Sequence, residues 1–204
     1  IVNRLISQPS FISHRYSFTG EGTLVKDLIG SAHATIQGGA KMDASGSLVL
    51  DGLNDYVDLP DGIISALDDT TFEAWVAWSG PETSKWQRVF DFGENTSNYL
   101  YLTTLSTSSN LPVQFAFARN ALEKKIGGGV SVPSDGTTST HFAVTYDNNA
   151  DSAFLYVNGQ FRGSVASTGS LSELNDVNNW LGRSQFSHLP YFNGTYHEFR
   201  SCNA

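Results

Sequence analysis

Cysteine, charge and long apolar runs are scarce in this sequence, and each scarcity argues against a class of protein. Cys202 is the single cysteine among 204 residues, which excludes an internal disulfide framework and a cysteine-clustered zinc site. Charged residues make up 16% of the chain and leave a formal net charge of −8, so we expect no binding to nucleic acid. No apolar run approaches the ~20 residues that span a bilayer, and we expect no membrane insertion.

The start of the sequence and two short motifs bear on where the protein resides. The chain opens on Ile1 without the charged and apolar regions of a secretory signal, and we interpret it as a mature or excised piece. Residues 95–97 (NTS) and 193–195 (NGT) fit the N-glycosylation acceptor pattern. Such short patterns also arise by chance, so they are compatible with a secreted protein without establishing one.

Apolar residues alternate at a period of two through most of the chain, whereas helical periodicity is almost absent. Asn158-Gly159 predicts a type I′ hairpin, because that turn needs positive φ at both central positions. A helix is conceivable around residues 62–68, while 106–110 and 164–172 are small polar stretches that we assign to loops. The predicted strands are 48–50, 56–59, 72–78, 89–92, 99–102, 113–118, 142–146, 154–157, 180–182 and 196–200.

Short strands separated by frequent turns favour an all-β fold, a two-sheet antiparallel β-sandwich. With 40% hydrophobic and 12% aromatic residues, the chain can bury one sizeable core. We therefore predict a single domain at residues 13–204, preceded by a tail or arm at residues 1–12.

The side chains that could perform catalysis are scattered. Glycoside hydrolysis needs two carboxylates a few ångströms apart, and no Glu lies two residues from an Asp within a strand-like run. The five histidines show no metal-type pairing, and no G-x-S-x-G elbow is present. We expect no enzymatic activity. Glu73 is either a buried acid or, by the alternative that we favour, a group hydrogen-bonded to a neighbouring strand.

Five phrases carry a family resemblance when they are taken in order. They are 13–18 (SHRYSF), 48–60 (LVLDGLNDYVDLP), 72–93, 141–159 and 180–200 (WLGRSQFSHLPYFNGTYHEFR). Their order and spacing resemble the concanavalin A-like lectin/glucanase superfamily and, within it, the laminin-G-like jelly-roll domains, over roughly residues 14–200. The glucanases of this superfamily carry a Glu-x-Asp-x-x-Glu strand, which this chain lacks, so the resemblance implies binding without hydrolysis.

Aromatic residues beside polar ones in loops predict carbohydrate binding, because a sugar packs its C–H face on an aromatic ring while polar groups bind its hydroxyls. Trp75 and Trp78 lie in a strand typical of the family and are expected in the core. A scaffold role is the alternative for Trp86, Arg88 and Arg183. The candidate ligand-binding residues are Trp86, Arg88, Asn98, Tyr99, Arg119, Asn120, Arg183, His188 and Tyr191.

The resemblance also implies a calcium site. Many relatives bind one Ca²⁺ between the loop after the first strand and the last strand, and calcium takes six to eight oxygen ligands. The matching positions are Asp27 and Glu198. His197 departs from the family, because relatives usually carry Asp there. The alternative is that Asp27 caps a turn while Glu198 pairs with an arginine.

The sequence thus predicts a non-catalytic, secreted or extracellular domain that binds a glycan or polysaccharide. It would act as a lectin or as a module that targets a larger enzyme to its polysaccharide. Two alternatives stay open: an adhesion domain that binds a protein through its loop edge, and a structural accessory domain packed against other domains of a larger protein. An exposed aromatic groove would favour sugar, and a flat edge rich in exposed aliphatic and charged residues would favour protein.

Overall fold

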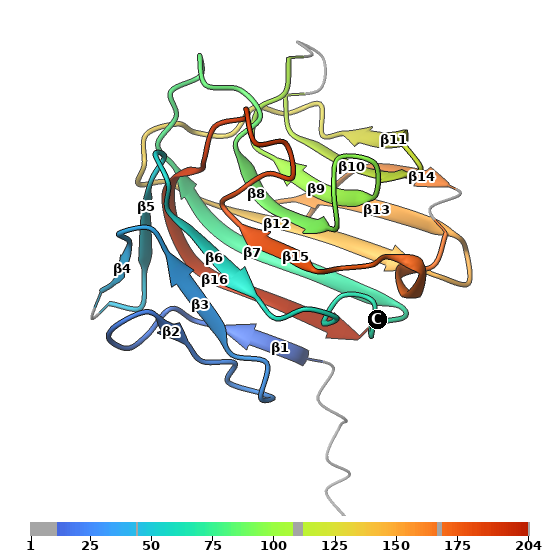
Figure 1. Ribbon diagram of the computed structural model, residues 1–204. Coiled ribbons are helices and arrows are strands. Elements are labelled where there is room, and N and C mark those ends of the chain that lie inside the picture. Colours follow the sequence, from blue (N-terminus) through green and yellow to red (C-terminus); the bar gives the residue numbers. More distant parts are fainter. Residues whose placement is uncertain (1–11, 44, 108–111, 167–168, 204) are drawn as a thin grey trace, which may run out of the picture.

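Two antiparallel sheets lie face to face as a β-sandwich (Figure 1). The computed structural model describes residues 12–43, 45–107, 112–166 and 169–203. Strands dominate these residues, and a short 3₁₀ helix, η1 (Leu171–Glu173), precedes β15. The predicted all-β sandwich is confirmed. The predicted tail lies outside the described residues except for Ile12, which begins the first strand and pairs with Cys202, so this strand starts one residue earlier than predicted.

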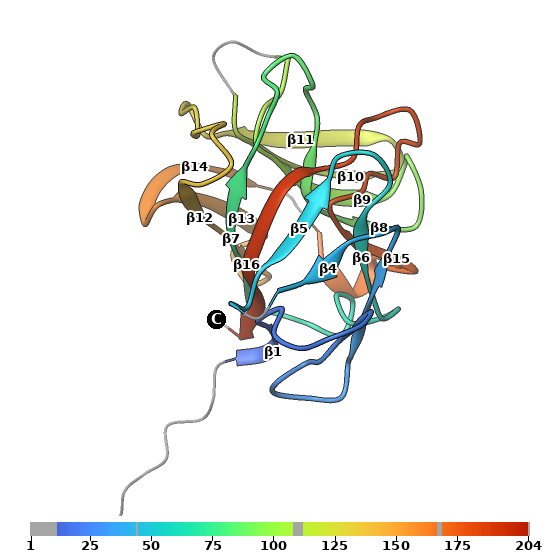
Figure 2. The same ribbon diagram turned by 90° about the vertical axis from the view of Figure 1, so that its left-hand side faces the viewer.

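Sheet A contains the first and last described strands. Its order is β14-β13-β12-β7-β16-β5-β4, and β1 pairs with β16 off this path. Figure 2 shows β1 beside the C-terminal end of β16, so both ends of the described chain are held in one sheet. The strand bounds are β1 (Ile12–Tyr16), β4 (Lys41–Met42), β5 (Leu48–Asp51), β7 (Thr70–Trp78), β12 (Ser139–Asp147), β13 (Ser152–Val157), β14 (Gln160–Ala166) and β16 (Asn193–Asn203).

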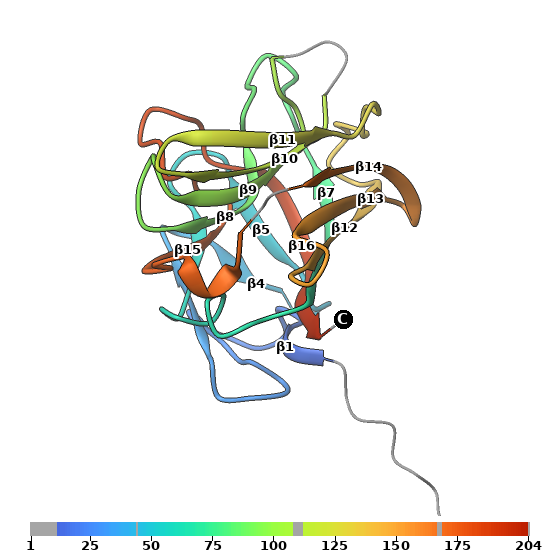
Figure 3. The same cartoon turned by 90° about the vertical axis from the view of Figure 1, so that its right-hand side faces the viewer.

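Sheet B faces sheet A in the order β11-β10-β9-β8-β15-β6-β3-β2. Figure 3 shows its strands β8 to β11 on one side of the sandwich and β12 to β14 on the other. The strand bounds are β2 (Leu24–Val25), β3 (Ala34–Gln37), β6 (Tyr56–Leu59), β8 (Arg88–Gly93), β9 (Tyr99–Thr103), β10 (Gln114–Arg119), β11 (Leu122–Gly127) and β15 (Asn178–Leu181).

The hydrophobic core lies between the sheets and is rich in phenylalanine. Phe92 of β8 packs against Phe72 of β7 and Phe199 of β16, with ring centroids 5.6 and 6.0 Å apart. Alternation along each strand directs every second side chain inward, and these three rings are at most 1% exposed. The core therefore joins the centre of one sheet to the centre of the other.

Trp75 is not in the core, contrary to the prediction, whereas Trp78 is buried as predicted. Alternation sends Trp75 to the outer face of sheet A because its neighbours Ala74 and Val76 point inward. There the indole stacks on His141 at 4.2 Å, and the Arg200 guanidinium lies 4.7 Å from its ring centre.

Every predicted strand overlaps an observed strand, but several observed strands were not predicted from the sequence. Asn158 and Gly159 have φ of 51° and 72°, which confirms the predicted type I′ hairpin. Asn120 and Ala121 have φ of 49° and 63° and make a similar turn between β10 and β11, although no glycine marks it. The predicted helix at 62–68 is a series of turns. The strands missed from sequence are β2, β3, β4 and β11. The second strand of the predicted hairpin, β14, extends to Ala166 and so includes the first residues of the loop predicted at 164–172.

Candidate ligand-binding site

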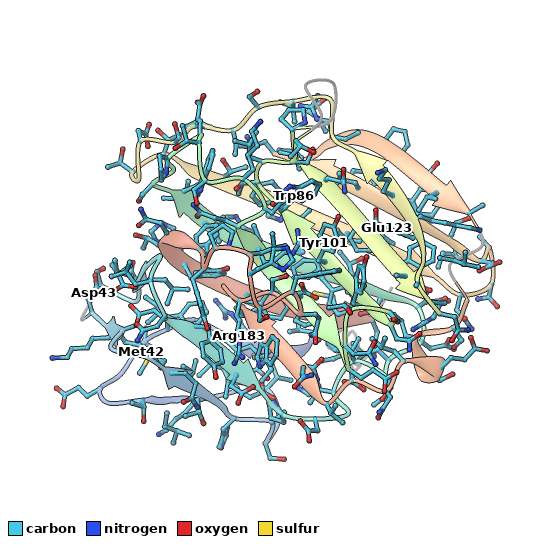
Figure 4. The ribbon with its side chains drawn as sticks, turned by 45° about the horizontal axis from the view of Figure 1, so that its top comes forward. Met42, Asp43, Trp86, Tyr101, Glu123 and Arg183 are labelled. Carbon is cyan, nitrogen blue, oxygen red and sulfur yellow. The ribbon has the colours of Figure 1, made fainter. Side chains whose placement is uncertain are left out.

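The outer face of sheet B carries a shallow aromatic pocket. We call it the outer pocket; its cavity measures about 250 Å³. Figure 4 shows Trp86, Tyr101 and Glu123 together on this face, with Arg183 further away. The lining residues are Trp86, Arg88, Tyr99, Tyr101, Glu123, Phe186, His188 and Leu189.

Two tyrosines of β9 form the floor of the outer pocket. Tyr99 and Tyr101 are two residues apart, so both point away from the core, and their rings stack at 5.7 Å with an angle of 24°. Their partners across the ladder with β10 are Ala118 and Ala116. Because these side chains are single methyl groups, no large neighbour covers the phenol rings from β10. Trp86 and Phe186 pack against the two rings instead, and Tyr99 and Tyr101 are 5% and 2% exposed.

Trp86 and Phe186 stand across the floor as walls. The indole of Trp86 is at 89° to the Tyr101 ring, and the Phe186 ring is at 77° to that of Tyr99. Trp86 has φ of 72°, a region that costs a bulky residue about 1–3 kcal/mol. Its N–H donates to the Leu105 carbonyl at 2.8 Å, which fixes the backbone that places the indole at the pocket.

Glu123 of β11 supplies a carboxylate at the rim. Its Oε2 accepts hydrogen bonds from the hydroxyls of Tyr99 at 2.8 Å and Tyr101 at 3.5 Å. Burial, reinforced by the negative charge of Glu123, raises the pKa of both phenols far above the usual value. The tyrosines therefore remain protonated donors at physiological pH and fix the orientation of the carboxylate.

A buried ion pair lies beneath the pocket. Arg88 Nε is 3.2 Å from Asp91 Oδ2, and both side chains are at most 2% exposed. The guanidinium also lies 3.5 Å from the centre of the Tyr101 ring. Burial raises the pKa of Asp91 to about 6, against the lowering effect of the Arg88 charge. Within the described part of the chain, Arg88 Nη1 and Asp91 Oδ1 have no hydrogen-bond partner.

Asp91 also holds the segment that forms one wall. Its Oδ2 accepts from Ser184 Oγ and from the Gln185 backbone N–H, each at 3.1 Å. Gln185 Nε2 donates to the Asn178 carbonyl at 3.0 Å. Residues 184–189, between β15 and β16, are thereby fixed over the outer face of sheet B, with Phe186 against the floor.

The structure brings four of the predicted ligand-binding residues to the outer pocket: Trp86, Arg88, Tyr99 and His188. Sequence reasoning did not select Tyr101, Glu123 or Leu189. Tyr101 had a readable signal, because its spacing of two from Tyr99 puts both on one face of a strand. Glu123 had none, since the charged strand β11 was not predicted.

Asn98, Asn120 and Arg119 lie near the pocket but do not line it. Asn98 Oδ1 accepts from the Asn120 backbone N–H at 2.8 Å, and Asn98 Nδ2 donates to Glu94 at 2.7 Å. Arg119 Nη2 donates to the Ser170 carbonyl at 2.7 Å. These contacts fasten the turn after β10 to the start of β9 and to the loop before η1.

Arg183 and Tyr191 belong to a second aromatic cluster on the same sheet. The Arg183 guanidinium lies 4.0 Å from the Trp180 ring and 4.7 Å from that of Tyr56, and Tyr191 is 6.2 Å from Tyr56. The cavity beside this cluster measures about 40 Å³. The predicted residues are thus divided between two places on sheet B.

The carboxylates of Asp27 and Glu198, the predicted calcium ligands, already have partners within the protein. Asp27 Oδ1 accepts from the N–H groups of Arg15 and Ile29, while its Oδ2 lies 2.8 Å from His14 Nδ1. Glu198 contacts Arg15 Nη2 at 2.8 Å and Arg200 Nη1 at 3.5 Å. Cationic and N–H donors thus occupy these carboxylates. Among the described residues, no group of three or more His, Cys, Asp and Glu side chains could hold a metal.

Glu73 joins three strands on the outer face of sheet A. Its Oε1 is 3.1 Å from His141 Nε2 on β12, and its Oε2 is 2.6 Å from Arg200 Nε on β16. Burial alone would raise its pKa, but the hydrogen bonds and charges of His141 and Arg200 outweigh it and lower the pKa to about 2. The favoured reading of Glu73 as a group bonded to neighbouring strands agrees with this geometry.

A known protein family matches most of this chain. A laminin G-type family model, described as the concanavalin A-like lectin/glucanases superfamily, matches residues 51–203. The chain therefore belongs to this superfamily, as predicted from the sequence. No curated protein matches the chain. Among the described residues, no helix has the length and apolar character needed to cross a membrane.

Solved structures share the fold at low identity. Domain 4 of AbnA, a GH43 extracellular arabinanase from Geobacillus stearothermophilus in complex with arabinotriose, has a TM-score of 0.78 at 19% identity, covering 97% of this chain and 94% of that chain. The CBM40 of the Ruminococcus gnavus IT-sialidase has a TM-score of 0.56 at 14% identity, covering 76% and 91%.

A toxin domain is also similar. The binding domain of botulinum neurotoxin DC, in complex with rat synaptotagmin II, has a TM-score of 0.65 at 11% identity and covers 95% of this chain and 48% of that chain. At these identities the likeness shows the fold alone, and the expected lack of enzymatic activity stays a prediction.

Proposed function

We propose that this domain binds carbohydrate through the outer pocket, as a non-catalytic lectin or module of an extracellular protein. One observation carries the proposal: four aromatic side chains, those of Trp86, Tyr99, Tyr101 and Phe186, line one pocket together with a carboxylate and a guanidinium. A sugar ring has apolar C–H faces and polar edges, so it needs an aromatic surface and hydrogen-bonding groups close together. The outer pocket supplies both.

The structural neighbours support this proposal without defining the ligand. One was solved with arabinotriose and belongs to an arabinanase described as extracellular, and another is the CBM40 of a sialidase. These two neighbours come from enzymes that act on sugars of different chemistry. We therefore take from them the class of ligand and the extracellular location, and take the placement of the site from this chain's own residues.

Protein binding is the second candidate. Leu24, Leu28 and Ile29 lie close in sequence around β2 and are 50%, 50% and 47% exposed. Exposed aliphatic side chains of this kind suit a protein partner better than a sugar. The neurotoxin binding domain solved with synaptotagmin II is a structural neighbour in complex with a protein. A partner would then contact the edge of sheet B and leave the outer pocket free.

The carbohydrate proposal does not depend on calcium. Neither Asp27 nor Glu198 lines the outer pocket. The calcium site remains a prediction from the family resemblance, and its test is separate from the test of sugar binding.

A glycan and polysaccharide array tests the proposed function. We expect the domain to bind a defined class of glycan, and Trp86→Ala to weaken that binding by at least about 10-fold, because an aromatic anchor contributes much of the energy of a small site. Tyr191→Ala in the second cluster is the matched control and should retain binding. Equal circular dichroism spectra and melting temperatures would show that both variants are folded.

Two results would contradict the proposal. Binding that Trp86→Ala leaves unchanged and Tyr191→Ala weakens would move the site to the second cluster. No binding to any glycan would favour a protein partner or a structural role.

A further inference from the structure

We propose that the outer pocket takes one neutral sugar residue at the end of a chain or branch, with Arg88 and Glu123 as its polar contacts. This inference rests on the proposed function and deepens it. It depends on the size of the pocket, on the segment that closes one side of it, and on the balance of charge around it.

The size of the outer pocket suits one sugar residue. Its cavity of about 250 Å³ is below the roughly 300–1,000 Å³ of pockets that hold drug-sized ligands. Trp86 and Phe186 stand nearly perpendicular to the tyrosine floor at 89° and 77°. Trp86 and Phe186 are partly exposed, whereas Tyr99 and Tyr101 beneath them are 5% and 2% exposed. A bound ring would therefore contact mainly these two walls, which leaves little room for a second ring.

The segment at residues 184–189 prevents a chain from continuing across the sheet. It separates the outer pocket from the second cluster of Tyr56, Trp180 and Tyr191, and Phe186 and Leu189 line the cavities on both of its sides. Buried hydrogen bonds from Ser184 and Gln185 to Asp91 hold it in place. The two aromatic clusters therefore do not form one continuous groove for an internal stretch of polysaccharide.

The charges around the pocket favour a neutral ligand. Arg88 is already paired with Asp91, and both are buried. Glu123 adds a second carboxylate at the rim, and Lys125, at 3.7 Å from Glu123, is 52% exposed. His188 is exposed at the rim. Arg88 is thus balanced by Asp91 and Glu123 by Lys125. A carboxylate on the ligand would lose its hydration without meeting an unpaired cation in either pair, so an acidic sugar would bind less well.

The unsatisfied groups match the hydroxyls of a neutral sugar. Arg88 lines the pocket, and its buried Nη1 has no partner within the described residues. An unpaired buried donor is costly, and a ring or hydroxyl oxygen of the ligand would remove that cost. Glu123 can accept a hydrogen bond from a neighbouring hydroxyl while the phenols hold its other oxygen. A sugar edge provides both an acceptor and a donor.

Chain length provides the first test. Isothermal titration with arabinose, arabinobiose and arabinotriose, and with the matching glucose and galactose series, measures affinity as neutral residues are added. Whichever series binds, we expect affinity to change by less than about 3-fold beyond the first residue that binds. A groove that contacts several residues would instead gain affinity with each added unit.

Charge provides the second test, with matched methyl glycosides of glucose and glucuronic acid and of galactose and galacturonic acid. We expect the acid to bind at least about 10-fold more weakly than its neutral partner, because each 1.4 kcal/mol of repulsion is a factor of ten. Glu123→Gln keeps the shape and removes the charge, so it should narrow this difference. Asp61→Asn, at an exposed position outside the pocket, is the control and should leave this difference unchanged.

The outcomes separate the two proposals. Rising affinity with length, or equal binding of the acid and neutral partners, would overturn this inference and leave carbohydrate binding standing. Absence of binding to every neutral and acidic sugar, including the array glycans, would overturn both.

Discussion

At the scale of single residues, Asp91 joins the floor of the outer pocket to its wall. One buried carboxylate oxygen accepts from Arg88 beneath the tyrosines and from Ser184 and Gln185 in the wall segment. Such a residue touches no ligand, yet it positions groups that would. It is invisible in the sequence, because a carboxylate among the apolar residues of β8 resembles an ordinary surface residue of an alternating strand.

Asp91→Asn should leave the protein at least as stable as the wild type at pH 7, because burial disfavours the carboxylate charge and raises the pKa of Asp91 to about 6. The neutral amide oxygen can still accept from Ser184 and Gln185. Arg88→Met should instead lower the free energy of unfolding by about 3 kcal/mol, because it leaves the Asp91 carboxylate buried without its counter-charge. Urea denaturation compares the two variants, and an Asp91→Asn variant as unstable as Arg88→Met would contradict the raised pKa.

Asp91 and Glu73 should act on stability in opposite directions as pH changes. Asp91 has a folded pKa of about 6 against an ordinary value of 3.8, so its contribution to stability is lost as pH rises through 6. Glu73 has a folded pKa of about 2 against 4.5, so its contribution is present above 4.5 and lost as pH falls toward 2.

Glu73→Gln tests the second of these effects. At pH 7 we expect the variant to be about 2 kcal/mol less stable than the wild type, because Arg200 and His141 lose their shared carboxylate. The difference should shrink as pH falls toward 2, where Glu73 itself becomes neutral. Denaturation curves at several pH values measure it, and a difference that is independent of pH would contradict the role of the charge.

At the scale of elements, the turns determine where strands begin and pair. Gly159 and Gly182 both have positive φ, at 72° and 89°. A Cβ at Gly159 would meet nothing within 4 Å, whereas one at Gly182 would lie 2.5 Å from Leu50 Cδ1. Gly182 follows β15 and begins the segment that leads to the pocket wall, so its close packing sets where that segment leaves the sheet.

Gly159→Ala should therefore cost about 1 kcal/mol of stability, from backbone conformation alone. Gly182→Ala should cost clearly more, because the same backbone cost is joined by a clash with the core. Thermal denaturation of the two variants compares them directly. Equal losses would mean that the core adjusts around residue 182 without cost.

Much of the element pattern could be predicted from the sequence, and the failures share a cause. Residues 72–78 and 99–102 alternate clearly and carry β-branched or aromatic residues, so their strands were evident. β11 was missed because residues 122–125 are largely charged, which is typical of an edge strand. The turn before it, Asn120-Ala121, lacks the glycine by which such turns are recognised.

The candidate site was only partly predictable for a related reason. Trp86 and Tyr99 were selected from local aromatic and polar patterns, and the structure places both in one pocket. Arg183 and Tyr191 were selected in the same way, but their side chains belong to the second cluster. The residues between them that line the outer pocket are Phe186, His188 and Leu189. Which face a loop residue occupies depends on contacts between segments that are distant in the sequence, such as Asp91 with Ser184, and no local pattern contains these contacts.

At the scale of the whole molecule, calcium bound at the predicted site of Asp27 and Glu198 would stabilise the pairing of the first strand with the last. Asp27 and Glu198 flank Arg15 of β1, which pairs with β16. Because these carboxylates already have N–H and arginine partners, we expect EDTA to leave the melting temperature unchanged. A fall in EDTA that calcium reverses and that Asp27→Ala abolishes would instead establish the calcium site predicted from the family.

The four tryptophans occupy four different surroundings, which gives the molecule an intrinsic optical reporter. Trp78 and Trp180 are buried at 3% and 9% exposure, and Trp75 is held between His141 and Arg200 on the opposite sheet. Trp86 alone among them lines the outer pocket. A sugar that binds in the outer pocket would therefore change the fluorescence of Trp86, so occupancy of this pocket can be followed without a label.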